Sequence, residues 1–355
     1  SRAAHPGMRL NAALLPLLLA PSLALRAAPV LTTRLRPNDV QQHAPALVMR
    51  RSTAPPRMVA LPMCPASGVL SLAVKAGCAT VLAQLSLVAA FRSSSDPVLK
   101  QAPGFAAHKL VALALMLYAT TFGVLGWLNP PATAYGAAAT AAGRLLVTSD
   151  SARFLAATLL GALVAWDIPT SLAVPRLRKP DVLVHHLAMA ATALVGSVYL
   201  PTHYGLYYMG FIELSSIPLT VYDAAEYAAE AAAKASPPAP ATRVERLRTL
   251  RDSSRTVSAL LFIAVRAIDF TRVTLLRFVP DALSVLRPEA ATPARFVPAL
   301  RFMCVSSVSF VALQLYWLSL FVRISAAQRK RGQSRAKRKG KAKPATPEQP
   351  SGEDA

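Results

Sequence analysis

The feature that most constrains this chain is a series of seven apolar stretches, each close to the roughly 20 residues that a helix needs to cross a bilayer. The chain has 355 residues, of which 54% are hydrophobic and 16% charged, and its mean hydropathy is +0.39. That is too little charge for an ordinary soluble domain of this length, so we predict an all-α membrane protein with about seven transmembrane helices. The expected spans are 68–91, 110–128, 152–170, 182–200, 204–222, 256–280 and 298–322.

The two ends of the chain differ in composition from this apolar body. Residues 1–67 begin with a Leu-rich segment of signal-peptide length after Met8 and continue with an Arg-rich segment that holds one acid, Asp39. A secretory signal followed by a disordered spacer and a bipartite plastid leader both fit this composition. We therefore predict a cleaved or disordered leader over 1–67 and a basic, disordered tail over 326–355.

The net charge of +22 is concentrated in these ends. Residues 1–58 and 323–355 together carry 18 of the 39 Lys and Arg and 4 of the 17 acids, a balance of +14. We interpret them as solvated or lipid-facing ends and expect no nucleic-acid partner. The connections 92–109, 176–179 and 243–255 are also basic, and with seven spans they fall on the same face as the tail. An excess of Lys and Arg predicts that this face is cytoplasmic, or stromal in a plastid.

Ionisable side chains within apolar spans are costly in hydrocarbon and suggest function. His185 and His186 open the fourth predicted span, and Asp167 closes the third at the same membrane face. Adjacent side chains on a helix project about 100° apart, so the pair is poorly arranged to hold one metal ion. We predict that one imidazole faces a cavity as base or nucleophile, with the other or Asp167 fixing its tautomer. The alternative is a pair of hydrogen-bonded packing residues near the interface.

A second set of charges lies in the fifth and sixth predicted spans. Glu213 is near the middle of the fifth, and Arg266, Asp269 and Arg272 follow at spacings of three in the sixth. Asp269 can pair with either arginine on one helix face, and Glu213 is the expected partner of Arg266 or Arg272 across helices. A structural ion pair explains these charges without chemistry, and contact with a bound substrate is the alternative.

Five motifs follow one another in the segments WDIP, HHLAMAATALVG, FIELSSIPL, FIAVRAIDFTR and LQLYWLSLFVRI. They comprise an aromatic-Asp element, a His pair, a Glu-Leu-Ser motif, an Arg within a span and an aromatic near the last span. The ordered set, over roughly 70–325, resembles the TLC-domain membrane proteins, which include ceramide synthases, translocon-associated proteins and proteins linked to membrane lipid composition. The resemblance implies a TLC-type transmembrane bundle over 68–325. The motif residues are Trp166-Asp167, His185-His186, Glu213-Leu214-Ser215, Arg266 and Trp317.

One departure from the family pattern bears on function. The ceramide-synthase branch continues after its His pair into a motif with Asn, Arg and a His-Asp-x-x-Asp cluster, whereas residues 204–217 here hold Glu213 as their one acid. The chain is therefore more similar to the non-synthase members, and this implies a role in membrane lipid composition rather than acyl-CoA-dependent ceramide synthesis.

Two functions are compatible with these residues and with the resemblance. The first is a lipid-homeostasis protein that binds or senses acyl lipids in an intramembrane cavity, and the alternative is an acyl-CoA-dependent lipid acyltransferase. A transporter fits less well, because matched repeats are not visible. We expect membrane lipids as partners, acyl-CoA in the enzymatic case, no cofactor, and the endoplasmic reticulum membrane or else a plastid membrane as location. The candidate catalytic residues are His185, His186 and Asp167, and the candidate substrate-binding residues are Glu213, Ser215, Arg266, Asp269 and Trp317.

Overall fold

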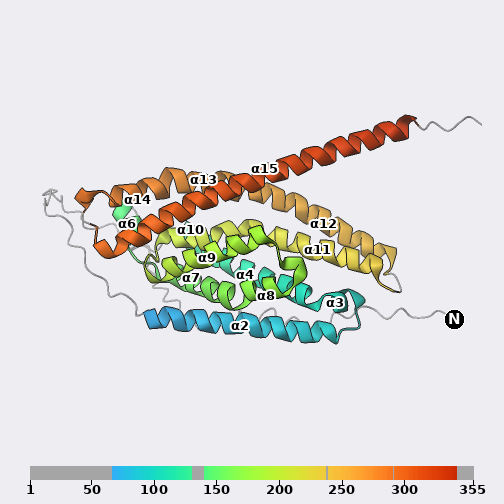
Figure 1. The fold of residues 1–355 in the computed structure, drawn as a ribbon, viewed down its shortest axis with the longest axis horizontal. Coiled ribbons are helices and arrows are strands. Elements are labelled where there is room, and N and C mark those ends of the chain that lie inside the picture. Colours follow the sequence, from blue (N-terminus) through green and yellow to red (C-terminus); the bar gives the residue numbers. More distant parts are fainter. Residues whose placement is uncertain (1–65, 130–139, 237–238, 291, 342–355) are drawn as a thin grey trace, which may run out of the picture. The chain divides into compact units, whose positions relative to one another are not determined.

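The computed structural model describes residues 66–129, 140–236, 239–290 and 292–341, and every regular element within them is a helix (Figure 1). The predicted leader, apart from its last two residues, and the tail from 342 lie outside the described residues. The principal helices are α2 (Ala66–Arg92), α3 (Pro97–Gln101), α4 (Pro103–Leu128), α6 (Ala141–Leu146), α7 (Asp150–Ala162), α8 (Ile168–Ala173), α9 (Pro180–Val198), α10 (His203–Met209), α11 (Ser216–Lys234), α12 (Ala241–Leu261), α13 (Phe270–Val273), α14 (Val279–Val285) and α15 (Val297–Lys341). The all-α prediction is confirmed.

Five of the described helices are long and apolar enough to cross a membrane. One of them joins α7 to α8 through the π-helical segment Leu163–Asp167, so that a single helix runs over 24 residues. The five are Ser67–Arg92, Pro103–Leu128, Asp150–Ala173, Pro180–Val198 and Ala294–Arg323.

The two other predicted spans are interrupted or charged, and the count of seven is therefore not confirmed. The fifth is divided into α10 and α11 by Gly210 and the 3₁₀ turn Phe211–Ser215. The sixth continues from α12 to α14 through π-helical segments at Phe262–Asp269 and Thr274–Phe278, and it carries the buried Arg266. Both nevertheless contribute to one cluster of buried apolar side chains, so they belong to the bundle.

Pairs of small residues let the helix backbones approach closely at two places. Gly123 in α4 lies against Gly210, and a Cβ added at either position would overlap the backbone opposite. Gly161 in α7 lies in the same way against Ala73 in α2. Small residues at such positions are the usual means of close helix packing in membranes. The first contact also fixes the turn that carries Glu213, three residues after Gly210.

The Gly123–Gly210 contact can be tested with a single methyl group. Gly123→Ala is expected to destabilise the protein by about 1–3 kcal/mol, because neither backbone can yield without moving its helix. Gly196→Ala is the matched control, since the nearest atom to a Cβ there is Met209 Cε at 3.8 Å. Thermal unfolding of the purified protein in detergent measures both. Equal melting temperatures for the two variants would contradict the close contact.

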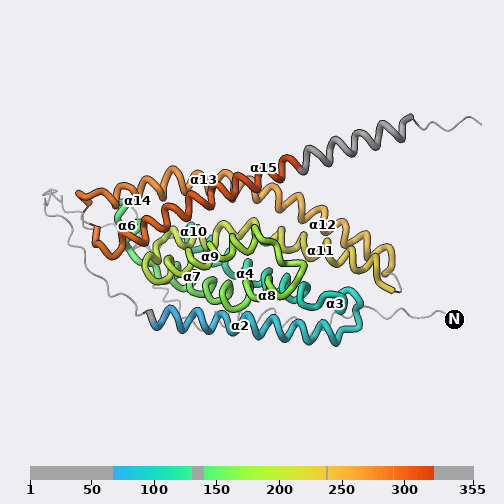
Figure 2. The backbone as a smooth tube through the Cα atoms, in the orientation of Figure 1, coloured from blue at the N-terminus to red at the C-terminus, as the bar shows by residue number. Residues whose placement is uncertain are grey.

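The last helix, α15, covers the side of the bundle that holds the sixth predicted span, which carries Arg266. Helix α15 packs against α9 and against the segments Phe262–Asp269 and Thr274–Phe278 (Figure 2). Helices α11 and α12 pack on each other as a helical hairpin. This hairpin extends past the 3₁₀ turn Phe211–Ser215 and the π-helical segment Phe262–Asp269. The arrangement brings α4, α8, α9, α11 and α15 around one interior space.

Candidate functional site

A cavity of about 350 Å³ lies among α4, the α7–α8 helix, α9, α11, the Phe262–Asp269 segment and α15. Seven of the eight residues singled out from the sequence line it, although they are spread over some 150 positions of the chain. Among the described residues Asp269 is the exception. The seven are Asp167, His185, His186, Glu213, Ser215, Arg266 and Trp317.

Asp167 stands at the centre of a group of imidazoles. It ends the π-helical segment Leu163–Asp167, and it is buried together with Trp166. Such widened turns inside α-helices are frequent at functional sites. His108 Nε2 lies 2.8 Å from Asp167 Oδ1, and His186 Nδ1 contacts Oδ2. A carboxylate shared in this way orients both rings and favours a proton on each facing nitrogen. This is the contact that the predicted tautomer-fixing role of Asp167 requires.

A second layer of contacts holds the His108–Asp167 pair in place. The indole of Trp166 stacks on His108 with ring centroids 4.9 Å apart. Its Nε1 donates to Gln84 Oε1 at 3.2 Å, and Gln84 Nε2 in turn donates to the carbonyl of Gly104 at 3.0 Å. Four buried groups from α2, α4 and the α7–α8 helix are therefore linked, and each fixes the orientation of the next.

Sequence reasoning missed His108 and Gln84. His108 falls just before the second predicted span, 110–128, whereas α4 begins at Pro103 and places it more than one turn inside the helix. Gln84 is the one amide side chain in a largely apolar span. A polar side chain isolated in this way was the signal that could have found it, because such groups in hydrocarbon need a partner.

The two adjacent histidines face different neighbours, as their 100° offset requires. His186 faces Asp167, whereas His185 is 9% exposed and packs edge-on against two aromatic rings of α15. Its ring centroid lies 5.2 Å from that of Trp317 and 5.5 Å from that of Phe310. His185 Nδ1 is buried and has no hydrogen-bond partner among the described residues. Both rings line the cavity.

Arg266 is held by a cradle on the turn that begins α11. Its Nε donates to Ser215 Oγ at 2.8 Å, and one terminal nitrogen lies 2.8 Å from Ser216 Oγ and 3.1 Å from Glu213 Oε2. The side chains of Arg266 and Glu213 are only 8% and 5% exposed. The expected interhelical pairing of Glu213 is confirmed, with Arg266 rather than Arg272 as its partner. A buried pair with further hydroxyl partners satisfies both charges within the bundle.

Asp269 is not brought to this cavity. It accepts hydrogen bonds from Tyr207 Oη at 2.8 Å and from Arg272 at 2.6 Å. These partners lie on a different face of the helix from the partners of Arg266. The spacing of three residues that suggested an Arg266–Asp269 pair is overridden, because the segment Phe262–Asp269 is π-helical and turns the two side chains apart. A pairing of Asp269 with Arg272 was also expected and is confirmed.

Basic side chains lie at the end of the cavity nearest the 176–179 connection. Lys109 Nζ lies 2.6 Å from Asp223 Oδ2, and both residues line the cavity. Lys179 lines it as well and is exposed. Within the described residues no group of three or more His, Cys, Asp or Glu side chains is arranged to hold a metal ion. Lys179, and Lys109 with its partner Asp223, thus line the same cavity as the imidazoles and Arg266.

A helical bundle with several apolar membrane-length helices and a charged interior cavity defines a multi-pass integral membrane protein. A family model for the TLC domain matches residues 105–323, more than half of the chain. The chain belongs to the TLC-domain family, as its ordered motifs indicated. No curated protein and no solved structure gives a significant match to it.

Proposed function

We propose that this protein binds an acyl lipid in the 350 Å³ cavity and acts in membrane lipid homeostasis. The observation that carries the proposal is the composition of the cavity wall. Charged and imidazole groups gather around Asp167 and Arg266, and apolar side chains such as Leu159, Leu163 and Leu219 line other parts of the wall. A wall that combines convergent polar groups with apolar stretches suits a ligand with one polar end and a hydrocarbon body.

The positions of the charged groups predict how the ligand is oriented in the cavity. A hydroxyl group placed between His186 and Arg266 could donate to His186 Nε2 and accept from Arg266, and an acidic group would meet Lys179 near the 176–179 connection. The hydrocarbon chain would follow the apolar wall towards Met189 on α9. We further propose the endoplasmic reticulum membrane as the location, on the strength of the Leu-rich segment that follows Met8.

Acyl transfer is the second candidate, and the contact between Asp167 and His186 favours it. With Nδ1 of His186 against the carboxylate, Nε2 is the nitrogen available as a base. It would take the proton from an acceptor hydroxyl or amine, whose oxygen or nitrogen attacks the thioester carbonyl of acyl-CoA. The carbon–sulfur bond then breaks, and the departing thiolate receives the proton from His186.

The proposal is tested by labelling the purified full-length protein with a photoreactive, alkyne-bearing palmitate. His186→Ala is expected to reduce saturable labelling about tenfold, the effect of losing one hydrogen bond to a charged or strongly polar group. Leu187→Ala is the matched control, since this neighbour on α9 is 57% exposed and should leave labelling unchanged. Equal labelling of both variants would exclude the His186 side of the cavity as the binding site.

A further inference from the structure

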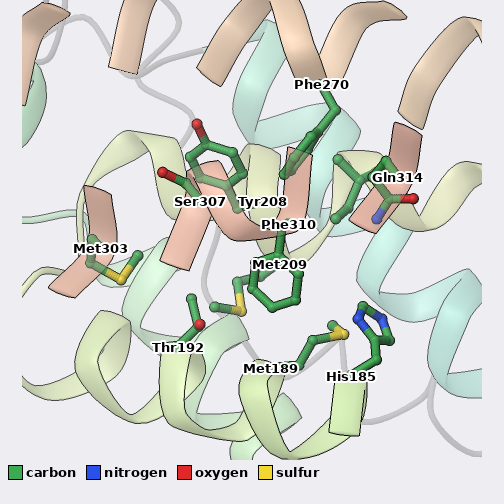
Figure 3. Close-up of a pocket in the computed structure, with 11 residues that line it drawn as sticks. His185, Met189, Thr192, Tyr208, Met209, Phe270, Met303, Ser307, Phe310 and Gln314 are labelled. Carbon is green, nitrogen blue, oxygen red and sulfur yellow. The ribbon is translucent and has the colours of Figure 1, made fainter. Parts of the chain in front are cut away.

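A second, smaller pocket shares lining residues with the cavity (Figure 3). It has a volume of about 30 Å³ and lies among α9, α10, α13 and α15. His185 and Met189 line both spaces, so they form the wall between them. Met209 and Met303 contribute flexible thioether side chains, which can shift to admit a short piece of chain.

The polar side chains of this pocket divide into two groups. Three of them, all hydroxyls, are satisfied within the protein: Thr192 by Ala188 and Ser306, Ser307 by Cys304, and Tyr208 by Thr274. Buried polar groups in proteins are normally paired in this way.

The other two polar groups keep an unpaired atom. Gln314 is 2% exposed, and its Oε1 has no partner among the described residues. His185 is 9% exposed, and its Nδ1 is likewise unpaired among them. A half-turn of the Gln314 amide exchanges its oxygen and nitrogen, so the pocket can offer either an acceptor or a donor. Two such groups, in a pocket whose other polar side chains are already paired, match a ligand segment that carries one hydroxyl.

We propose that the pocket receives the hydroxyl of a hydroxylated acyl chain, with Gln314 and His185 as its hydrogen-bond partners. The inference rests on the proposed binding of an acyl lipid and names the class of chain. Position in the fold favours a hydroxyl close to the acyl carbonyl. His185 lines the polar cavity as well, and Gln314 lies one helical turn before Trp317, which lines that cavity too.

The test is displacement of tritiated palmitate from the purified full-length protein by palmitate, 2-hydroxypalmitate and 3-hydroxypalmitate. At least one hydroxylated chain is expected to displace the label at a concentration about 5–10-fold lower than palmitate does, as one added hydrogen bond allows. Gln314→Leu should abolish this preference and leave displacement by palmitate unchanged. Ser307→Ala, in the same pocket but with its hydroxyl bonded to Cys304, should keep the preference.

The outcomes separate this inference from the function on which it rests. Saturable palmitate binding with no preference for either hydroxylated chain would overturn the hydroxyl site and leave acyl binding standing. A preference that survives Gln314→Leu would also overturn it, because the hydroxyl would then be recognised elsewhere. Absence of saturable palmitate binding to the wild type would overturn the proposed function itself. Unchanged palmitate binding by the leucine variant reports that it is folded.

Discussion

Glu213→Gln is expected to destabilise the folded protein by about 3–5 kcal/mol, the effect of removing one partner from a buried ion pair. Arg266 would remain buried with its hydrogen bonds to Ser215 and Ser216 but without a carboxylate to balance its charge. The double variant Glu213→Leu/Arg266→Met, which removes both charges, should recover most of the lost stability. Unfolding of the purified protein in mixed detergent micelles containing SDS measures the free energy of unfolding of the wild type, the single variant and the double variant.

The matched control uses the second ion pair of the sixth predicted span, Arg272–Asp269. Arg272 contacts Asp269 on an exposed face, so Arg272→Met should leave the stability nearly unchanged. A destabilisation by Glu213→Gln no larger than that of Arg272→Met would show that the pair is not buried in the folded protein. A double variant as unstable as the single one would show that the charges do more than neutralise each other.

Asp167→Asn is expected to destabilise the protein by about 2–3 kcal/mol and to impair the cavity. The amide keeps the size of the carboxylate, but it cannot accept a hydrogen bond from His108 and also present a charged oxygen to His186. If the protein is an acyltransferase, release of CoA thiol from palmitoyl-CoA should fall by about 10⁴-fold, as expected when the base loses the carboxylate that orients it.

Asp150→Asn serves as the control for this substitution, because Asp150 begins α7 and its side chain is 95% exposed. The two variants are compared by melting temperature in detergent and by thiol release under the same conditions. If the wild type releases thiol and Asp167→Asn releases it equally fast, the Asp167–His186 pair is excluded from catalysis. Equal melting temperatures would show that Asp167 is not a buried centre of the folded bundle.

The sequence could predict those site residues whose charged or imidazole side chains are energetically costly to place in hydrocarbon. Charged or imidazole side chains within apolar spans singled out Asp167, His185, Glu213 and Arg266, because each must be paired or functional at that depth. Partners with weaker signals were not found. His108 falls within the predicted basic connection 92–109, and its pairing with Asp167 spans 59 positions that no local pattern links.

The misplacement of Asp269 and the unconfirmed span count have a common physical origin. Both depend on departures from ideal α-helix that the sequence did not reveal, namely the π-helical segment Phe262–Asp269 and the break at Gly210. The first rotates Asp269 away from the cavity. The second is stabilised by contact with Gly123, a partner 87 positions earlier in the chain, so local propensity alone does not specify it.

The measurement that tests an acyl-lipid site inside the bundle most directly is the location of the photoreactive palmitate on the wild-type protein, mapped by mass spectrometry of labelled peptides. We predict label on the cavity-facing residues of α9 and α15, close to Met189 and Trp317, and its displacement by unlabelled palmitate. Label confined to outward-facing side chains such as Val184 and Leu276, which are 67% and 72% exposed, and not displaced by competitor, would contradict such a site.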